Sequence, residues 1–269
     1  GLAPGIGRVG VGDGEHLHRL REIALPAHRR VGGNEGDAGA VAHRGQQRFD
    51  EQPRAAANVD LRAITENVHA LQDRAPTAQV MAVVKADGYG HGAVEVAHAA
   101  VDGGAQGLCV ALVQEAIELR QAGVDAPILV LSEQPAESAD DIVRFRLMAT
   151  VYSVGFIDAL AKAARDRGIE GVPVHLKIDT GMQRVGVGAD GAAAMVAALE
   201  AEAPTLRLVG VFTHLAVADD PTDRFTDDQL ERFDDALAGL SPILPGTGAT
   251  GLLVHAANSA GGLAHPAAR

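Results

Sequence analysis

Seven short apolar segments alternate with amphipathic ones along most of the chain, and this alternation limits the possible folds more than any other feature. A further amphipathic stretch, residues 61–71, precedes the first apolar segment. Nearly continuous apolar strands separated by helices predict a parallel sheet covered by helices. The predicted strands are 80–85, 107–112, 127–131, 147–151, 172–178, 206–212 and 251–256, and the predicted helices between them are 92–103, 113–122, 136–145, 155–167, 190–202 and 226–239.

Two architectures have this alternation: a doubly wound open sheet and a TIM-type (β/α)8 barrel. No dinucleotide-binding fingerprint follows the first predicted strand and the repeats have an even length, so the sequence favours the barrel. A match to that fingerprint at residues 5–10 (GIGRVG) has too few residues before it for the strand that gives the pattern its meaning. Because seven strands are one fewer than the barrel needs, we expect an incomplete barrel with two open parallel edges.

The first 52 residues do not resemble the rest of the chain. They are rich in glycine, contain no lysine and show no lasting apolar periodicity. Such a composition does not predict a packed core. We therefore leave residues 1–52 unassigned, as a disordered or non-native segment, and assign residues 53–269 to the barrel domain.

Charge and composition exclude several classes of function. The formal net charge is −12 and no basic run is interleaved with aromatic residues, so we expect no nucleic-acid partner. No apolar stretch has the length of a membrane span and no secretion signal is recognisable, which predicts a cytoplasmic protein without a membrane partner. The single cysteine, Cys109, lies in an apolar segment and is expected in the core. The histidines lack the spacing of metal ligands, so we predict no metal site.

Polar and charged side chains collect where four of the predicted strands end. In a parallel barrel these ends meet at one mouth, where functional residues gather. An amine there can form a Schiff base with an aldehyde, and N–H groups at a helix start suit a phosphate. One phosphorylated aldehyde is pyridoxal 5′-phosphate (PLP); the other interpretation of such a lysine is a plain surface charge. The residues are Lys85 and Tyr89 after the first strand, Lys177, Asp179 and Arg184 after the fifth, His214 after the sixth, and Asn258 and Ser259 after the seventh.

Four separate stretches resemble the bacterial alanine racemases, a PLP-dependent family. AVVKADGYGHG (82–92) is similar to the cofactor-lysine motif of that family over its whole length. The other three agree in order and spacing: HLKIDTGMQRVGV (175–187), VFTHLAVADD (211–220) and HAANSAGGL (255–263). The resemblance covers about residue 53 to the C-terminus, and it implies the family's N-terminal barrel domain.

The resemblance also implies a role for each candidate around the cofactor. Lys85 would carry PLP covalently and act as the base that handles the α-proton of D-alanine. Tyr89 and Ser259 would bind the phosphate, with Asn258 as a further cofactor contact. His214 would pack beside the pyridine ring.

Two more residues match substrate-side positions of the family. Arg184 would lie near the phenolic oxygen of PLP and orient the carboxylate of the substrate. Lys177 matches a lysine that is carbamylated in many members, where the carbamate holds that arginine in place. The implied reaction is the interconversion of L- and D-alanine, which supplies D-alanine for the peptidoglycan of the cell wall, in a full-length protein that is a homodimer.

Parts of the family pattern have no counterpart in the sequence. These are the eighth strand, an arginine at the pyridine nitrogen, the C-terminal β-domain and the tyrosine that serves as the second base. The chain has two tyrosines, Tyr89 and Tyr152, and neither stands in that tyrosine's context. We therefore expect a fragment in which PLP binding can persist without racemisation. The alternatives are a non-catalytic PLP-binding barrel, whose known kind lacks the TGM and HAANSAG stretches, and a chain too incomplete to fold stably.

Overall fold

Eight parallel strands form a closed ring in the computed structural model, which describes residues 19–24, 58–244 and 251–268. Each strand pairs with its neighbour in chain order, and β9 pairs back with β1. A short strand, β7 (Val187–Gly188), pairs with the end of β6 outside the ring. The ring strands are β1 (Arg19–Ala24), β2 (Gln79–Val83), β3 (Gly107–Val110), β4 (Ile128–Val130), β5 (Met148–Val151), β6 (Val172–Asp179), β8 (Leu206–Phe212) and β9 (Leu253–His255).

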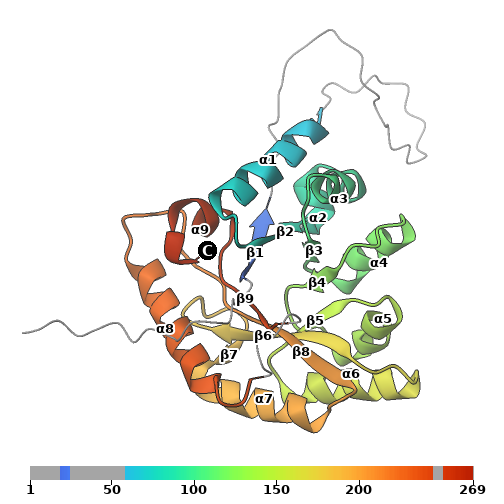
Figure 1. Ribbon diagram of the computed structural model, residues 1–269. Coiled ribbons are helices and arrows are strands. Elements are labelled where there is room, and N and C mark those ends of the chain that lie inside the picture. The colour runs from blue at the N-terminus through green and yellow to red at the C-terminus, as the bar shows by residue number, and fades with distance from the viewer. Residues whose placement is uncertain (1–18, 25–57, 245–250, 269) are drawn as a thin grey trace, which may run out of the picture.

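Helices follow the strands and surround the ring (Figure 1), so the predicted TIM-type (β/α)8 architecture is confirmed. All seven predicted strands and the helices between them are present, with shifts of a few residues at their ends. The helices are α1 (Leu61–Arg74), α2 (Lys85–Gly90), α3 (Ala93–Asp102), α4 (Val113–Gln121), α5 (Ala139–Arg144), α6 (Val154–Asp166), α7 (Ala192–Ala201), α8 (Phe225–Leu240) and α9 (Ser259–Ala264); single 3-10 turns are η1 (Ala136–Ser138), η2 (Ala189–Gly191) and η3 (Pro266–Ala268).

The expected open edges are absent from the described strands, and this corrects the sequence analysis. Strand β1 lies between β9 and β2 and pairs with both in parallel, so the eighth position is occupied from the N-terminal side of the chain. Strand β1 lies within residues 1–52, where the sequence analysis did not expect a strand. The remainder of that segment lies outside the described residues, and the domain boundary at residue 53 stays a prediction.

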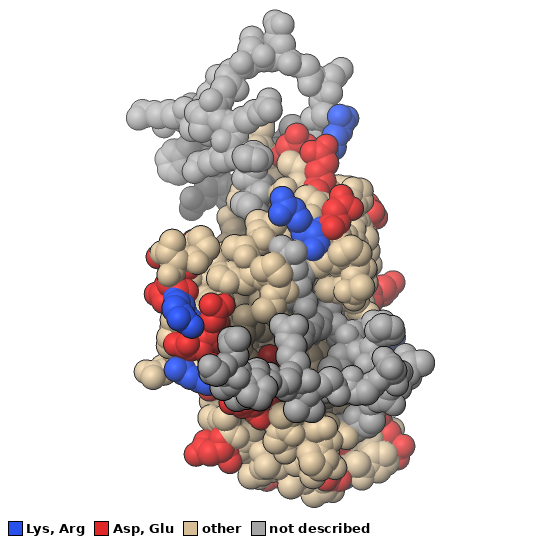
Figure 2. Space-filling model, turned by 60° about the vertical axis from the view of Figure 1, so that its left-hand side comes forward, with Lys and Arg blue, Asp and Glu red and all other residues tan. Residues whose placement is uncertain are grey.

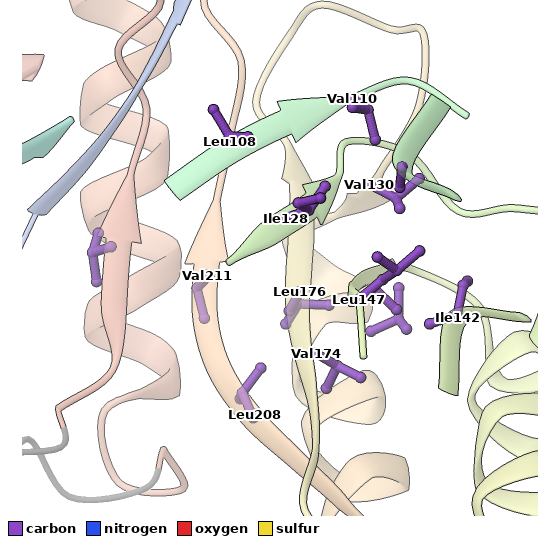
Figure 3. Close-up of a cluster of buried hydrophobic side chains, with 14 of the residues drawn as sticks. Leu108, Val110, Ile128, Val130, Ile142, Leu147, Val174, Leu176, Leu208 and Val211 are labelled. Atoms are coloured by element: carbon purple, nitrogen blue, oxygen red, sulfur yellow. The ribbon is translucent and has the colours of Figure 1, made fainter. Parts of the chain in front are cut away.

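The outward side chains of the strands form one large core beneath the helices. Successive side chains of a strand point to opposite faces, and alternate residues therefore share an environment. On β3 and β4 the outward residues are Leu108, Val110, Ile128 and Val130, all fully buried. Figure 3 shows these side chains in the same cluster as side chains from β6, β8 and α5. This core fixes the helices on the ring.

The inward side chains fall into two groups of different chemistry. The apolar half of the interior comes from β2, β3 and β4 and forms a separate buried cluster of Met81, Val83, Cys109 and Leu129. Cys109 is thus a core residue, as predicted. The polar half comes from β6, β8 and β9 and consists of His175, Lys177, Phe212 and His255, all buried.

Acidic side chains are spread over the face of the molecule drawn in Figure 2, with fewer basic ones among them. This distribution agrees with the net charge of −12. None of the described helices has the length and apolar character needed to cross a membrane.

Candidate functional site

Lys85 begins a left-handed turn directly after β2. The four residues that follow it have φ angles of 52°, 53°, 60° and 59°, and three of them are not glycine: Ala86, Asp87 and Tyr89. This conformation costs an L-residue about 1–2 kcal/mol. Strain of this kind persists where surrounding contacts hold it, and it concentrates at functional sites. The turn leaves Lys85 partly buried at the mouth and Tyr89 43% exposed, with the Lys85 Nζ 5.9 Å from the centroid of the Tyr89 ring.

Carboxylates hold both ends of this turn. At its start, the backbone N–H of Ala86 donates a 2.7 Å hydrogen bond to Oε1 of Glu115 on α4. At its end, Asp87 Oδ1 accepts from the N–H of Ala93, the first residue of α3. The position of Lys85 therefore depends on contacts that the turn makes with α3 and α4.

Lys177 reaches the same mouth in a different way, from within the regular strand β6. Its side chain is only 4% exposed, and its Nζ lies 4.9 Å from the ring centroid of Phe212. Phe212 in turn stacks on His255 with 4.5 Å between ring centroids. The three residues are register partners on β6, β8 and β9, so they form one layer across the polar half.

His214 lies just beyond the end of β8, and its pKa reports what surrounds it. Burial is the main reason that this pKa falls to about 4. The positive charges of Lys177, Arg184 and Lys85 lower it further, in that order. His214 is consequently a neutral imidazole near pH 7. Cations that follow two different strands, β6 and β2, therefore act on the same imidazole at the mouth.

A buried amide fixes the loop that carries His214. Gln229 on α8 donates from Nε2 to the carbonyl of His214 (3.0 Å) and to the Thr180 hydroxyl (3.2 Å). Its Oε1 accepts from the N–H of Ala216, so the amide joins the loops after β6 and β8. Thr180 also shares a 2.8 Å hydrogen bond with Thr213.

Asn258 and Ser259 stand at the start of α9. Asn258 caps the helix, since its Oδ1 accepts from the N–H of Gly261, and its Nδ2 donates to the carbonyl of Leu215. Its amide therefore ties α9 to the loop after β8. Ser259 is the first residue of that helix and is partly exposed.

The structure thus brings Lys85, Lys177 and Arg184 around His214, while Asn258 also has a structural task that the sequence did not indicate. Sequence reasoning missed Glu115 and Gln229, which orient the loops of the mouth. Glu115 is the third residue of α4, a position where a carboxylate can cap a helix, but Leu112 replaces the Ser or Thr that would have signalled it. No local sequence pattern predicts that Gln229 contacts the loops after β6 and β8. Within the described ranges, no cluster of His, Cys, Asp and Glu could hold a metal ion.

Chemically, this mouth offers two amines, a guanidinium and a neutral imidazole. Such a set can bind an anionic ligand, and the less buried amine, Lys85, is placed to react with a carbonyl group.

Comparison with known protein families gives a match over most of the chain. A family model described as "Alanine racemase, N-terminal domain" matches residues 59–269. Among curated proteins, the alanine racemase of Thermobifida fusca is 45% identical over 222 residues, which are 80% of this chain and 57% of that protein. Alanine racemase 1 of Bacillus subtilis is 42% identical over 208 residues, covering 77% and 51% of the two chains. The chain thus spans about half the length of the curated relatives it matches.

Solved structures give the same result. The alanine racemase from a D-cycloserine-producing Streptomyces lavendulae aligns with a TM-score of 0.72 at 36% identity, over 77% of this chain and 54% of that chain. The alanine racemase of Bacillus anthracis, solved with bound L-Ala-P, aligns with a TM-score of 0.67 at 34% identity, over 76% and 51%.

Proposed function

The chain belongs to the alanine racemase family, and on that premise we propose that it binds PLP through Lys85 at the barrel mouth. We further propose that it serves the interconversion of L- and D-alanine. The observation that carries the proposal is the position of Lys85 and Lys177 at the carboxyl ends of β2 and β6, where they and Arg184 act electrostatically on His214. PLP brings a phosphate and a phenolate, and an amino-acid substrate brings a carboxylate. Three cations around a neutral imidazole fit these anionic groups.

Each residue at the mouth has a task toward this ligand. Lys85 supplies the amine that holds the aldehyde carbon, and the phenol of Tyr89, a residue that is 43% exposed, would donate a hydrogen bond to a phosphate oxygen. Ser259 offers a hydroxyl to the same phosphate, beside the cap that Asn258 forms. His214 offers an uncharged ring face to an aromatic ligand.

Two further residues act on the carboxylate side. Arg184 is exposed and can pair bidentately with a carboxylate. Lys177 is held within the polar half by Phe212 and donates a 3.4 Å hydrogen bond to the carbonyl of Leu131. Its task, directly or as a carbamate, is to keep Arg184 in place.

The chemistry that PLP supplies when bound is withdrawal of electrons from the α-carbon of the amino acid, which makes the α-proton removable. Lys85 then takes or returns that proton on its own side of the substrate. Racemisation also needs an acid–base group on the opposite side. In the full-length family, according to the resemblance, a tyrosine of the partner subunit provides it.

A second candidate function is PLP binding without racemisation, and the tyrosines of the chain favour it. Tyr89 shares a turn with Lys85, so it lies on the same side as the first base. The pKa of the Tyr152 phenol is raised, first by burial and then by the charge of Glu133, so less of it is the phenolate that could accept a proton. Within this sequence these two are the only tyrosines.

Borohydride reduction of the protein mixed with PLP, followed by peptide mapping, tests the proposal. The chain has three lysines, which permits a complete set of variants. Lys85→Ala should abolish the reduced PLP–lysine adduct, and Lys177→Ala should retain it with weaker PLP binding. Lys162→Ala is the matched control, because Lys162 lies on the exposed face of α6 and pairs with Asp166.

The outcomes separate the candidates. An adduct that persists in Lys85→Ala, on Lys177 or Lys162, would contradict the assignment of Lys85. If the adduct maps to Lys85, incubation with D-alanine in D2O distinguishes the two functions. Formation of L-alanine supports racemisation, whereas α-deuterated D-alanine alone supports a barrel with one working base.

A further inference from the structure

One carboxylate, that of Glu115, accepts three backbone N–H groups from two different strand ends. Its Oε1 accepts from Ala86, after β2, at 2.7 Å. Its Oε2 accepts from Ala111 and Leu112, after β3, at 2.8 and 3.0 Å. Both oxygens are therefore used, each toward a different loop. Glu115 links the loop of Lys85 to the regular structure of α4.

The bond to Ala86 falls at the point where the backbone enters the left-handed conformation. Ala86 has a φ of 52°, an unfavourable value for an alanine. The turn itself supplies later bonds, from the N–H of Gly88 to the carbonyl of Val84 and from that of His91 to the carbonyl of Asp87. Neither of these fixes the peptide that directly follows Lys85. Within the described structure, that N–H donates its hydrogen bond to Glu115.

We propose that Glu115 is a positioning residue for the cofactor amine: it anchors the strained turn and thereby sets the direction of the Lys85 side chain. The cofactor part of this inference rests on the proposed function above. Hydrogen bonds to a charged acceptor are stronger than neutral ones and shorter on average. A glutamate can therefore hold a strained peptide that a neutral side chain would hold less well.

A purely structural task for Glu115, the capping of α4, is the competing explanation. The chain contains a matched carboxylate that separates the two. Glu133 also accepts three hydrogen bonds, from the N–H groups of Tyr152 and Ser153 and from the Ser153 hydroxyl. It stabilises the start of α6, on the far side of β4 from the Lys85 turn, and none of these three hydrogen bonds reaches that turn.

The experiment compares Glu115→Gln with Glu133→Gln. An amide has one acceptor oxygen, so glutamine at position 115 can serve one loop and not both. We expect the dissociation constant for PLP to rise about tenfold to a hundredfold in Glu115→Gln. In Glu133→Gln the dissociation constant for PLP should stay within about threefold of the wild-type value. The loss of stability in urea should be similar in the two variants. Hydrogen exchange of the peptide covering 85–92, measured without PLP, should accelerate in Glu115→Gln alone.

A rescue variant excludes capping as the cause. Glycine adopts the left-handed conformation without strain, so Ala86→Gly added to Glu115→Gln should recover part of the PLP affinity. A helix cap has no reason to respond to residue 86. Equal PLP dissociation constants in the two glutamine variants, or the absence of any rescue, would overturn the inference.

The two proposals can fail separately. If wild-type protein forms no adduct at Lys85, the proposed function fails, and the exchange of residues 85–92 still tests the anchor. Unchanged exchange in Glu115→Gln overturns the anchoring role, whatever PLP does. Faster exchange confined to that peptide supports it.

Discussion

The two halves of the barrel interior are filled by different means. In the apolar half, Met81, Val83, Cys109 and Leu129 contact one another and carry no charge. In the polar half, two histidines, a lysine and a phenylalanine are buried on β6, β8 and β9. His175 Nδ1 and His255 Nε2 lie 3.0 Å apart, while His175 Nε2 is buried without a hydrogen-bond partner within the described structure.

This difference indicates which part of the interior stabilises the fold and which part contributes to the functional site. Burial of apolar side chains stabilises a core without a desolvation penalty, whereas buried polar groups cost free energy unless they are paired. The polar half reaches the mouth through Lys177, and the apolar half has no such side chain at that depth. We infer that the apolar half supports the ring, including the strand that leads to Lys85, while the polar half supplies the buried charge of Lys177 to the site.

The largest expected effect is a loss of stability in acid that comes from the polar half. Burial lowers the pKa of His175 to about 3, and burial followed by neighbouring positive charge lowers that of His255 well below its ordinary value. Both histidines take up protons more readily when the chain is unfolded. Their contribution to the free energy of unfolding is therefore fully present above about pH 6.5 and is lost as the pH falls below that value. His175 and His214, with pKa values of about 3 and 4, should each remove about 2 kcal/mol between pH 6.5 and 4.5, and His255 adds to this loss.

Urea unfolding at pH 7 and 4.5 measures this loss. His175→Gln should reduce the acid loss by about 2 kcal/mol, because His175 no longer titrates while His255 and His214 still do. Leu129→Ala, in the apolar half, is the control and should leave the acid loss unchanged. An identical acid loss in wild type and His175→Gln would remove the distinction between the halves.

Truncation of an aromatic side chain gives the next effect in size. Phe212→Ala should cost about 3–5 kcal/mol, since the ring is fully buried and stacks on His255. It should also weaken PLP binding, because Lys177 rests on that ring. Leu129→Ala should cost about 2–5 kcal/mol and leave PLP binding within about twofold. Urea unfolding measures the loss of stability in each variant, and PLP titration measures its dissociation constant. Equal changes in that constant in Phe212→Ala and Leu129→Ala would contradict the different roles of the two halves.

A volume-conserving change in the apolar half should have the smallest effect. Met81 is a register partner of Gly107, and its side chain lies over that glycine. Met81→Leu keeps the volume and should cost less than about 1.5 kcal/mol, with PLP binding unchanged. Its midpoint in urea, compared with that of Phe212→Ala, checks the prediction. A loss of stability equal to that of Phe212→Ala would show that the apolar half is as sensitive to changes in side-chain shape as the polar half.

The strands that sequence could predict are those whose signal is local. Runs such as 127–131 and 206–212 are apolar because helices cover them, and this shows in the residues themselves. Strand β1 (RLREIA) has no such run, and charged residues interrupt its apolar ones. Its pairing with β2 and β9 depends on residues far along the chain, which no local pattern reports.

The site shows the same limit. The rule that strand ends meet at one mouth predicts that Lys85, Lys177 and Arg184 lie together, and all three lower the pKa of His214. The left-handed angles at Ala86 and Asp87 could not be anticipated from those residue types. Glu115 holds that turn from another helix. Its contact is tertiary, so the sequence contains no short-range sign of it.

The closure of the ring by β1 has a consequence for how the protein is made. Leu20 pairs with Gln79 on one side and with His255 on the other. A ribosome releases the first of these partners early and the second only near the end of the described chain. Contacts so distant in sequence form late because the intervening chain must be brought round first. Throughout that interval one edge of β1 has no neighbour, and this is the period in which a nascent barrel is most open to pairing with another chain.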